Sequence, residues 1–366
     1  MSVKEVSVFF DHQCYWERYG GVSRYFTEIL KTDIEDADYQ LALKYSNNEY
    51  LRELDFECKP FLDNVCISKK HYAISAANKP NSVRMLRRTN ANIVHLTHYD
   101  PYLFKHIHKK IVVSTIHDLN FFAIPEFFGR QTELLKTWQI RCINNSDKII
   151  TISEKTKEDI IKYFKIPNDK ITRIYHGINS VFKKTSEERV VSAPYILFVG
   201  RRGGYKNFDI VKQSFARIAS KYSEIMLVCT GQQFSANEKK SLYAYGIYDR
   251  VLHISANEKT LVNLYSNALF FIFPSLYEGF GLPLLEAMSC ECPVLCSNAS
   301  CFPEIAENAV LYFDPCSVED ICEKMIELIE HETFRESLIE MGSKRKESFS
   351  WEKSRQEHFE FYKSLL

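Results

Sequence analysis

Two glutamates, Glu278 and Glu286, stand at the ends of the segment EGFGLPLLE, residues 278–286. The short apolar run before this segment, residues 269–274, predicts a buried strand, and residues 284–288 predict a helix. A turn that opens a helix presents backbone N–H groups without partners and a partial positive charge. Together with two carboxylates, such donors suit a ligand that carries both phosphates and sugar hydroxyls.

The same two glutamates also fit the acid and nucleophile of a retaining glycosidase. That mechanism needs its carboxyl groups about 5 Å apart, and a turn followed by a helix holds these two farther apart. We therefore expect both to act as hydrogen-bond acceptors, Glu286 near a ribose and Glu278 near a sugar. A capping or surface role is the alternative for either residue taken alone.

A second loop, GRRGGYKN at residues 200–207, lies between a predicted strand at 195–199 and a helix predicted to begin near Phe208. Its glycines allow close approach to a ligand, and Arg202 and Lys206 supply cationic donors to phosphate oxygens. Their expected task is to neutralise a leaving diphosphate. A solvated basic loop is the alternative, and the position at the end of a strand favours binding.

The first half of the chain contains two weaker candidates. Gly20 and Gly21, in YGGVSRYF, lie between the first predicted strand and its helix, where backbone amides can meet phosphate or sugar. A tight turn without a ligand explains paired glycines equally well. His117 and Asp118, in IHDLNFF, follow another strand, so His117 is either a structural histidine or a hydrogen-bonding partner of a reacting sugar.

Composition narrows the function classes. The chain has 366 residues, 45% of them hydrophobic, and equal numbers of basic and acidic side chains, which argues against nucleic acid as a partner. The N-terminal sequence reads as a strand and not as a signal peptide, so we expect a cytoplasmic protein. The 11 cysteines lack paired metal-ligand spacing and are expected to be reduced and structural.

Two histidine-rich stretches, HLTH at residues 95–98 and KHIHKK at 105–110, lack the spacing of a zinc helix, so no metal site is expected. The second stretch lies beside Tyr102, Leu103 and Phe104. It is a candidate for peripheral contact with anionic lipid headgroups at the cytoplasmic face of a membrane. An exposed loop of no special role is the alternative.

Strand-like runs alternate with helical patterns along the chain, which predicts an α/β protein with parallel sheets. A polar stretch at residues 183–193 is the predicted linker between two doubly wound domains that face one another across a cleft, residues 1–185 and 192–345. Residues 346–366 predict an amphipathic helix that crosses back. The predicted strands are residues 6–10, 93–96, 111–116, 148–152, 171–175, 195–199, 225–229, 251–254, 269–273 and 294–296.

The ordered motifs YGGVSRYF, IHDL, ITISEKTKEDI, IYHGIN, LFVGRRGGYKNF, FPSLYEGFGLPLLEAM and CFPEIAENAVLYFDP resemble the retaining glycosyltransferases of family 4, which have the GT-B fold. The resemblance covers nearly the whole chain. It implies a metal-independent hexosyltransferase without a cofactor, whose donor is a nucleoside diphosphate sugar held by the second domain. It also implies a glycan or lipid-linked glycan acceptor, as in the synthesis of surface polysaccharides such as O-antigen.

By position, the resemblance implies a role for each motif. Arg202 and Lys206 would hold the diphosphate, with Arg201 as the other candidate, and His117 would lie by the reacting sugar carbon. A general likeness to polysaccharide mannosyltransferases favours a GDP-mannose donor. Glu286 would bind the ribose and Gly20 and Gly21 would line the cleft, while the sugar and phosphate would meet Glu278, Gly279, Phe280, Gly281 and Leu282, and the base a loop around Ser255.

Two alternatives share this fold. A nucleotide-sugar epimerase or a phosphorylase would change its substrate without a glycan or lipid acceptor. A binding module without catalysis would keep the donor site and release no product. The presence of Arg202, Lys206, Glu278, Glu286 and His117 argues against the binding module.

Overall fold

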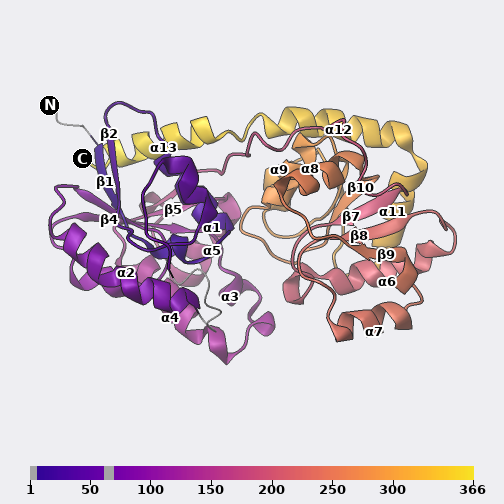
Figure 1. The fold of residues 1–366 in the computed structure, drawn as a ribbon, viewed down its shortest axis with the longest axis horizontal. Coiled ribbons are helices and arrows are strands. Elements are labelled where there is room, and N and C mark those ends of the chain that lie inside the picture. The colour runs from indigo at the N-terminus through magenta and orange to yellow at the C-terminus, as the bar shows by residue number, and fades with distance from the viewer. Residues whose placement is uncertain (1–5, 62–69) are drawn as a thin grey trace. The chain divides into compact units, whose positions relative to one another are not determined.

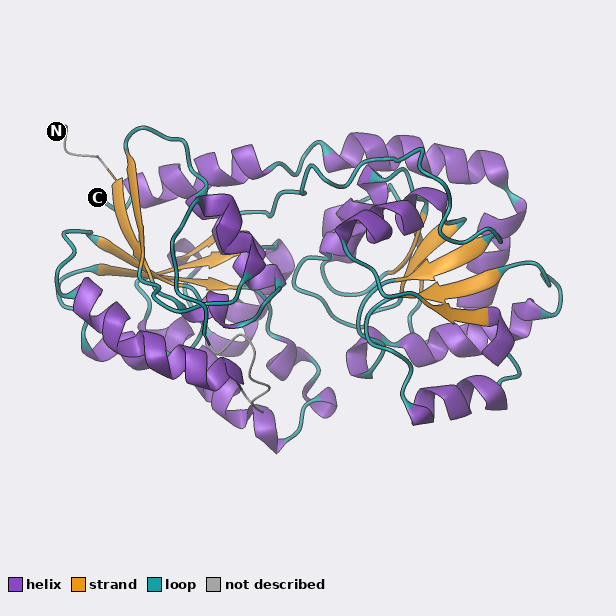
Figure 2. Ribbon diagram, in the orientation of Figure 1, coloured by secondary structure: helices purple, strands orange, loops and turns teal. Residues whose placement is uncertain are grey.

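The structure is a computed structural model that describes residues 6–61 and 70–366 (Figure 1). The chain divides into two compact units. The N-terminal unit comprises Met1–Gly177 and Trp351–Leu366, and the C-terminal unit comprises Ile178–Ser350. Each unit holds a six-stranded, fully parallel sheet with helices on both faces, which confirms the predicted fold class (Figure 2).

The sheet of the N-terminal unit has the strand order β2-β1-β3-β4-β5-β6. Its inner strands are nearly continuous apolar runs because helices cover both faces. The strands are β1 (Val6–Phe10), β2 (Ala37–Leu41), β3 (Ile93–Leu96), β4 (Ile111–Ile116), β5 (Lys148–Thr151) and β6 (Ile171–Arg173). The helices are α1 (Gly21–Leu30), α2 (Lys70–Leu86), α3 (Asn120–Ala123), α4 (Glu133–Asn145), α5 (Glu154–Phe164) and α13 (Trp351–Lys363), with the 3₁₀ helices η1 (Gln13–Trp16), η2 (Glu49–Leu54) and η3 (Pro101–Lys105) among the short turns.

The sheet of the C-terminal unit has the order β12-β11-β10-β7-β8-β9. Its strands are β7 (Tyr195–Phe198), β8 (Met226–Cys229), β9 (Val251–His253), β10 (Phe270–Phe273), β11 (Val294–Ser297) and β12 (Leu311–Phe313). Its helices are α6 (Phe208–Ala219), α7 (Ala236–Ala244), α8 (Glu258–Asn267), α9 (Leu282–Ser289), α10 (Phe302–Ala306), α11 (Val318–Glu330) and α12 (Glu332–Lys346), with the 3₁₀ helices η7 (Gly204–Lys206) and η8 (Tyr248–Arg250).

The sequence did not predict β2 and β12, which are both edge strands. An edge strand has one neighbour and is less buried, so it needs fewer apolar residues. In β2 only the end residues Ala37 and Leu41 are buried, and the residues between them are partly exposed. Such a strand lacks the continuous apolar run that marks the inner strands.

Helix α13 returns the chain to the N-terminal unit, where it packs against α1 and β1 (Figure 1). Its buried residues include Trp351, Phe359 and Tyr362 of the predicted apolar face, whereas Leu366, predicted on the same face, is exposed. The Tyr362 ring meets Phe10 of β1 edge-on at 6.4 Å between ring centres. The last helix is therefore part of the core of the first unit.

None of the helices within residues 6–61 and 70–366 combines the length and the apolar character needed to cross a bilayer.

Candidate functional site

The chain reverses its direction of strand addition between β7 and β10. Strands β7, β8 and β9 are laid down to one side, and β10 then pairs with the other edge of β7. At such a reversal the loops after the two central strands diverge and leave a crevice at the carboxyl edge of the sheet. The loop after β7 contains GRRGGYKN, and the loop after β10 contains EGFG. The two predicted binding segments therefore meet at one place.

Hydrogen bonds fasten these two loops together. The backbone N–H of Leu276 donates to the carbonyl of Tyr205 at 2.9 Å, and the Asn207 side chain donates to the carbonyl of Pro274 at 3.2 Å. The backbone N–H of Glu278 donates to Ser300 Oγ at 3.1 Å, and that hydroxyl donates back to the Glu278 carbonyl at 2.7 Å. The backbone around both charged side chains is therefore fixed before any ligand arrives.

Lys206 and Glu278 form an ion pair between the two loops, with Nζ 2.5 Å from Oε1. The two side chains keep 25% and 15% of their surfaces exposed. An ammonium group has three N–H donors, so Lys206 still has donors for a phosphate oxygen while it stays paired. The structure thus brings the predicted cation and the predicted sugar-binding carboxylate into direct contact.

Arg202 is engaged by the protein at every nitrogen. Its Nε donates to Glu238 at 2.7 Å, Nη1 donates to the carbonyl of Thr230 at 2.8 Å, and Nη2 donates to the carbonyl of Gln232. The guanidinium also lies 4.6 Å from the centre of the Phe234 ring, and the side chain is only 4% exposed. A ligand of Arg202 would have to displace one of these contacts.

Arg201, one residue earlier, is exposed. No carboxylate in the described parts of the chain lies within ion-pair distance of it. Gly200, before it, has a φ of +109°, a conformation that favours glycine and turns the chain sharply at the end of β7. Of the two adjacent arginines, Arg201 is therefore the one whose guanidinium donors are available.

The segment EGFGLPLLE folds as the sequence predicted. Helix α9 begins at Leu282 and is preceded by Gly281, whose φ is +95°. A Cβ at Gly281 would meet the Phe302 ring at 3.2 Å, so both conformation and space require glycine. No side chain caps this helix, which leaves backbone donors of Gly281 and Leu282 for a ligand. The Phe280 side chain is buried, so Phe280 contributes only its backbone here.

Glu286 lies on α9 and accepts a hydrogen bond from the Tyr265 hydroxyl at 3.2 Å. Burial raises the pKa of its carboxyl group to about 7, although the Tyr265 bond acts in the opposite direction.

Ser255, the predicted base contact, is exposed in the loop after β9. Strand β8 separates β9 from β7, so Ser255 lies beyond the loops that hold Lys206 and Glu278.

In the N-terminal unit, Gly20 precedes α1 in an extended conformation and Gly21 is the first residue of the helix. A side chain at Gly21 would meet nothing within 4 Å, so the space there is open. The 3₁₀ helix η1 lies between β1 and these glycines. They are therefore at the start of a helix, as predicted, but in a longer connection than a tight turn.

His117 follows β4, and its ring is packed edge-on against Tyr25 with 5.1 Å between ring centres. Within the described residues its buried Nε2 has no hydrogen-bond partner. Burial, with a smaller contribution from His98, lowers the pKa of His117 to about 3. The imidazole is therefore neutral near pH 7 and can donate or accept one hydrogen bond to a substrate.

Asp11, which is fully buried at the end of β1, was not among the predicted site residues. Its carboxylate accepts from the Thr97 backbone at 2.9 Å and from the Thr97 hydroxyl and Gln13 amide, each at 2.5 Å. Burial raises the pKa of Asp11 to about 6. Strands β1 and β3 flank the strand reversal of this unit, and the hydrogen bonds between Asp11 and Thr97 join the segments that follow these two strands. An aspartate directly after a predicted strand was the available signal.

Two family models cover most of the chain. The model described as Glycosyltransferase Family 4 matches residues 19–181, and the model described as Glycosyl transferases group 1 matches residues 182–345. The O-antigen chain mannosyltransferase B of Escherichia coli is 28% identical over 268 residues, which are 69% of this chain and 70% of that protein. The O-antigen chain mannosyltransferase RfbU of Salmonella typhimurium is 30% identical over 211 residues, 55% of this chain and 56% of that protein.

Solved structures share the fold over nearly the full length. Anabaena HepE in complex with UDP-glucose has a TM-score of 0.75 at 16% identity and covers 98% of this chain and 99% of its own. A glycosyltransferase from Rickettsia africae has a TM-score of 0.74 at 17% identity, with 98% of both chains covered. At these identities the similarity establishes the fold.

Proposed function

Because the chain belongs to the family 4 glycosyltransferases of GT-B fold, we propose that it transfers a hexose, with retention, from a nucleoside diphosphate sugar to a glycan or lipid-linked glycan. The product would be part of a surface polysaccharide such as O-antigen. The relatives named as O-antigen mannosyltransferases support this role and favour GDP-mannose as the donor. The HepE complex supports UDP-glucose as the second donor to test.

The observation that carries the proposal is the Lys206–Glu278 pair beside the open N-terminus of α9. Lys206 and the backbone donors of Gly281 and Leu282 would neutralise the diphosphate, with Arg201 as the second cation. Glu278 would accept hydrogen bonds from the sugar hydroxyls. The site thus offers a cation and free helix N–H groups for the diphosphate, and a carboxylate acceptor for the sugar hydroxyls.

The remaining roles follow from the same placement. Glu286 would accept from the ribose, and the loop at Ser255 would meet the base. Arg202 is proposed to hold the loop after β7 in shape through Glu238 and Thr230, in place of the direct diphosphate contact expected from spacing. His117, Gly20 and Gly21 are the candidates of the N-terminal unit for contact with the transferred sugar.

The chemistry is departure of the diphosphate with development of positive charge on the sugar ring. The acceptor hydroxyl then attacks the same face, and an oxygen of the departing phosphate takes the acceptor proton. The protein contributes charge neutralisation and positioning, the electrostatic contribution that usually dominates such catalysis. In this proposal the phosphate charge would be neutralised by cationic side chains and backbone N–H groups, and these roles need no metal.

A thermal-shift screen of sugar nucleotides tests donor identity. A donor at a hundred times its dissociation constant adds about 2.7 kcal/mol to the free energy of unfolding. GDP-mannose is expected to raise the melting temperature of the wild type more than UDP-glucose, and Lys206→Ala should lose most of the shift. A larger shift with UDP-glucose would overturn the preference for GDP-mannose.

Product analysis then separates transfer from the two alternatives. Incubation with donor and a panel of glycan acceptors is expected to give a new glycoside that keeps the anomeric configuration of the donor. A changed sugar nucleotide without acceptor would instead indicate an epimerase, and donor binding without any product would indicate a binding module.

A further inference from the structure

A small, largely enclosed pocket of about 70 Å³ lies in the N-terminal unit and contains none of the residues named in the proposed reaction. Strand β1 pairs with β2 along one edge and with β3 along the other, so the direction of strand addition reverses between β1 and β3. Ligands of open parallel sheets bind beyond the carboxyl ends of the strands at such a reversal. Residues that follow both strands line the pocket, which therefore lies where a ligand is expected.

Hydrogen bonds join the two segments that line this pocket. The Gln13 side-chain amide, after β1, donates to the carbonyl of Asp100 at 3.0 Å. The backbone N–H of Asp100, after β3, donates back to Gln13 Oε1 at 2.8 Å. The pocket is therefore formed before a ligand enters.

Aromatic side chains make up the apolar part of the lining, namely Trp16, Tyr72 and Trp138. The Trp16 ring meets the Tyr72 ring edge-on, with 6.4 Å between their centres, and lies 5.1 Å from the His98 ring. Ala76, on α2, lines the pocket as well. Such rings offer flat apolar surfaces to the C–H groups of a ligand.

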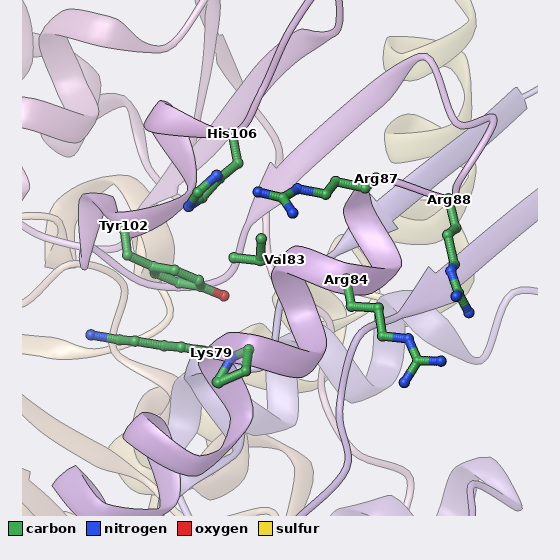
Figure 3. A pocket seen from close by; sticks show the side chains of 8 residues that line it. Lys79, Val83, Arg84, Arg87, Arg88, Tyr102 and His106 are labelled. Atoms are coloured by element: carbon green, nitrogen blue, oxygen red, sulfur yellow. The ribbon is translucent and has the colours of Figure 1, made fainter.

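The charged part of the lining is an ion pair. Lys79 Nζ lies 2.5 Å from Asp100 Oδ2 and 5.3 Å from the centre of the Tyr102 ring. Figure 3 shows Lys79 extending from α2 to the Tyr102 ring and away from Arg84 and Arg88, which lie farther along the helix. The lining thus carries one cation and one anion, and no net charge.

His98 adds an uncharged donor and acceptor to the lining. Burial lowers its pKa to about 4, so near pH 7 one imidazole nitrogen donates and the other accepts. No residue in the described parts of the chain forms a hydrogen bond with this imidazole. Tyr99, the next residue, accepts a hydrogen bond from the backbone of His117 at 3.2 Å, so the pocket adjoins His117.

These properties narrow the groups that a sugar could place here. The volume admits a few water-sized groups, which suits one substituent and not a whole pyranose ring. A hydroxyl group has no apolar part to cover the aromatic rings, and a methyl group alone would leave His98 unpaired. A carboxylate or phosphate would meet the Asp100 carboxylate in a lining without net positive charge. An acetamido group has a methyl group, an N–H donor and a carbonyl acceptor, and matches each part of the lining.

We propose that this pocket binds the acetamido group of an N-acetylated amino sugar in the acceptor. Its methyl group would pack against Trp16 and Trp138, its N–H would donate to Asp100, and its carbonyl would accept from His98. A carboxylate has about four lone-pair sites, so Asp100 can accept this bond while it stays paired with Lys79. The inference rests on the proposed transfer to a glycan, and it adds the substrate class of that glycan.

Tryptophan fluorescence tests the pocket without a donor. Trp16 and Trp138 are two of the three tryptophans of the chain, so a ligand in the pocket should change the emission. The full-length protein is titrated with the methyl glycosides of N-acetylglucosamine and N-acetylgalactosamine. The methyl glycosides of glucose and galactose, which carry a hydroxyl at the same carbon, are the paired ligands. At least one N-acetylated glycoside is expected to bind about tenfold to a hundredfold more tightly than its hydroxyl counterpart.

Two variants place the ligand in this pocket. Ala76→Leu fills the pocket from an exposed position on α2 with a residue that also favours a helix, and should abolish the response. The matched control is Ala244→Leu, at an exposed position on α7 of the C-terminal unit, and should respond like the wild type. His98→Phe keeps a ring but removes both nitrogen atoms, and should reduce the preference for the N-acetylated glycosides.

Equal affinity for the N-acetylated and hydroxyl glycosides would overturn the proposal, as would a wild type that responds to none of them. A response that Ala76→Leu retains would also overturn it. Transfer assays separate this inference from the proposed function. Binding of N-acetylated glycosides without transfer to any glycan would support the pocket and contradict the transfer function. Transfer with the same acceptor KM whether or not the glycan is N-acetylated would support the transfer function and contradict the pocket.

Discussion

The hydroxyl of Tyr25 lies 2.7 Å from Nε2 of His358 and joins α1 to α13, 333 residues later in the chain. His358 Nδ1 lies 2.7 Å from the Ser354 carbonyl, which can only accept, so Nδ1 carries the proton. In a neutral imidazole Nε2 then accepts, and Tyr25 is the donor. Thr115 Oγ1, 3.2 Å from the same hydroxyl, must therefore donate to Tyr25.

The same reasoning extends the chain of hydrogen bonds to a second residue of α13. His95 Nε2 lies 2.9 Å from Thr115 Oγ1, and His95 Nδ1 lies 2.6 Å from the Tyr362 hydroxyl. Because the Thr115 hydroxyl donates its hydrogen bond to Tyr25, it can only accept from His95. His95 therefore donates from Nε2 and accepts from Tyr362 at Nδ1. With this single assignment of donors and acceptors, every hydroxyl and imidazole in the buried series of hydrogen bonds has its partners, and both imidazoles are neutral.

Tyr25→Phe should therefore destabilise the N-terminal unit. The change removes one hydroxyl and leaves His358 Nε2 and the Thr115 proton buried without partners, at a cost of about 1–3 kcal/mol. Urea unfolding followed by tryptophan fluorescence measures it. The control is Tyr19→Phe, because Tyr19 is 57% exposed, and this change should not shift the unfolding midpoint. Equal midpoints for both variants would contradict the directional chain.

Acid should destabilise the same unit before pH 4 is reached. Burial lowers the pKa of six histidines of this unit. Below about pH 6.5 the unfolded chain therefore binds protons at these histidines that the folded unit does not bind. Stability is thus full above pH 6.5 and falls as pH drops toward 4, by at most about 1.4 kcal/mol per pH unit for each histidine. The affected residues are His12 and His117 (to about 3), His98 and His358 (to about 4), and His95 and His176 (well below the usual value).

All three tryptophans, Trp16, Trp138 and Trp351, belong to the N-terminal unit, so their fluorescence reports its unfolding alone. Asp11, whose pKa burial raises to about 6, acts in the opposite direction but is one group against six. The variant His358→Gln should show a shallower loss of stability with falling pH. A stability that is flat between pH 7 and pH 5 in the wild type would show that these histidines are protonated in the folded unit.

Alanine substitutions of the two adjacent arginines are expected to affect different properties, activity for Arg201 and stability for Arg202. Arg201→Ala is expected to lower donor turnover by about tenfold to a hundredfold with an unchanged melting temperature, because its side chain is exposed. Arg202→Ala should instead cost about 3 kcal/mol of stability, because Glu238 loses its buried partner. Lys240→Ala serves as the exposed control. The assignment fails if Arg202→Ala keeps full stability while turnover drops and Arg201→Ala behaves like the control.

Glu286 should make donor affinity depend on pH. With its pKa raised to about 7 by burial, the free carboxyl group gains a proton as pH falls below 7 and loses acceptor capacity for the ribose hydroxyls. Donor affinity measured by titration calorimetry is expected to rise between pH 6 and pH 8. Glu286→Gln should bind more weakly and remove this rise. A rise of the same size in the variant would assign the titration to another group.

The sequence predicted the inner strands because helices cover both faces of a parallel sheet and leave a continuous apolar run. It missed β2, whose middle residues are partly exposed at the sheet edge. Lys206 and Glu278 were found from their positions after strands, and the strand order then brought them together. Spacing could not separate Arg201 from Arg202, because the partners of Arg202 lie 28 to 36 residues away in sequence.

A cluster of exposed cations in the N-terminal unit shows the same limit. Sequence composition singled out residues 102–110, whereas Arg84, Arg87 and Arg88 are spread along a helix pattern that reads as an ordinary solvated surface. Only the packing of α2 beside η3 places both sets around one groove.

The position of α13 has a consequence for synthesis on the ribosome. Residues 178–350 form a complete compact unit, and they leave the exit tunnel before α13 does. Domains usually mature in the order of synthesis. Here the unit that begins first lacks His358 and Tyr362, and with them part of its buried hydrogen-bond chain, until the other unit is already made. The nascent first unit is thus held incomplete while the second folds, and it is the one that needs protection from aggregation.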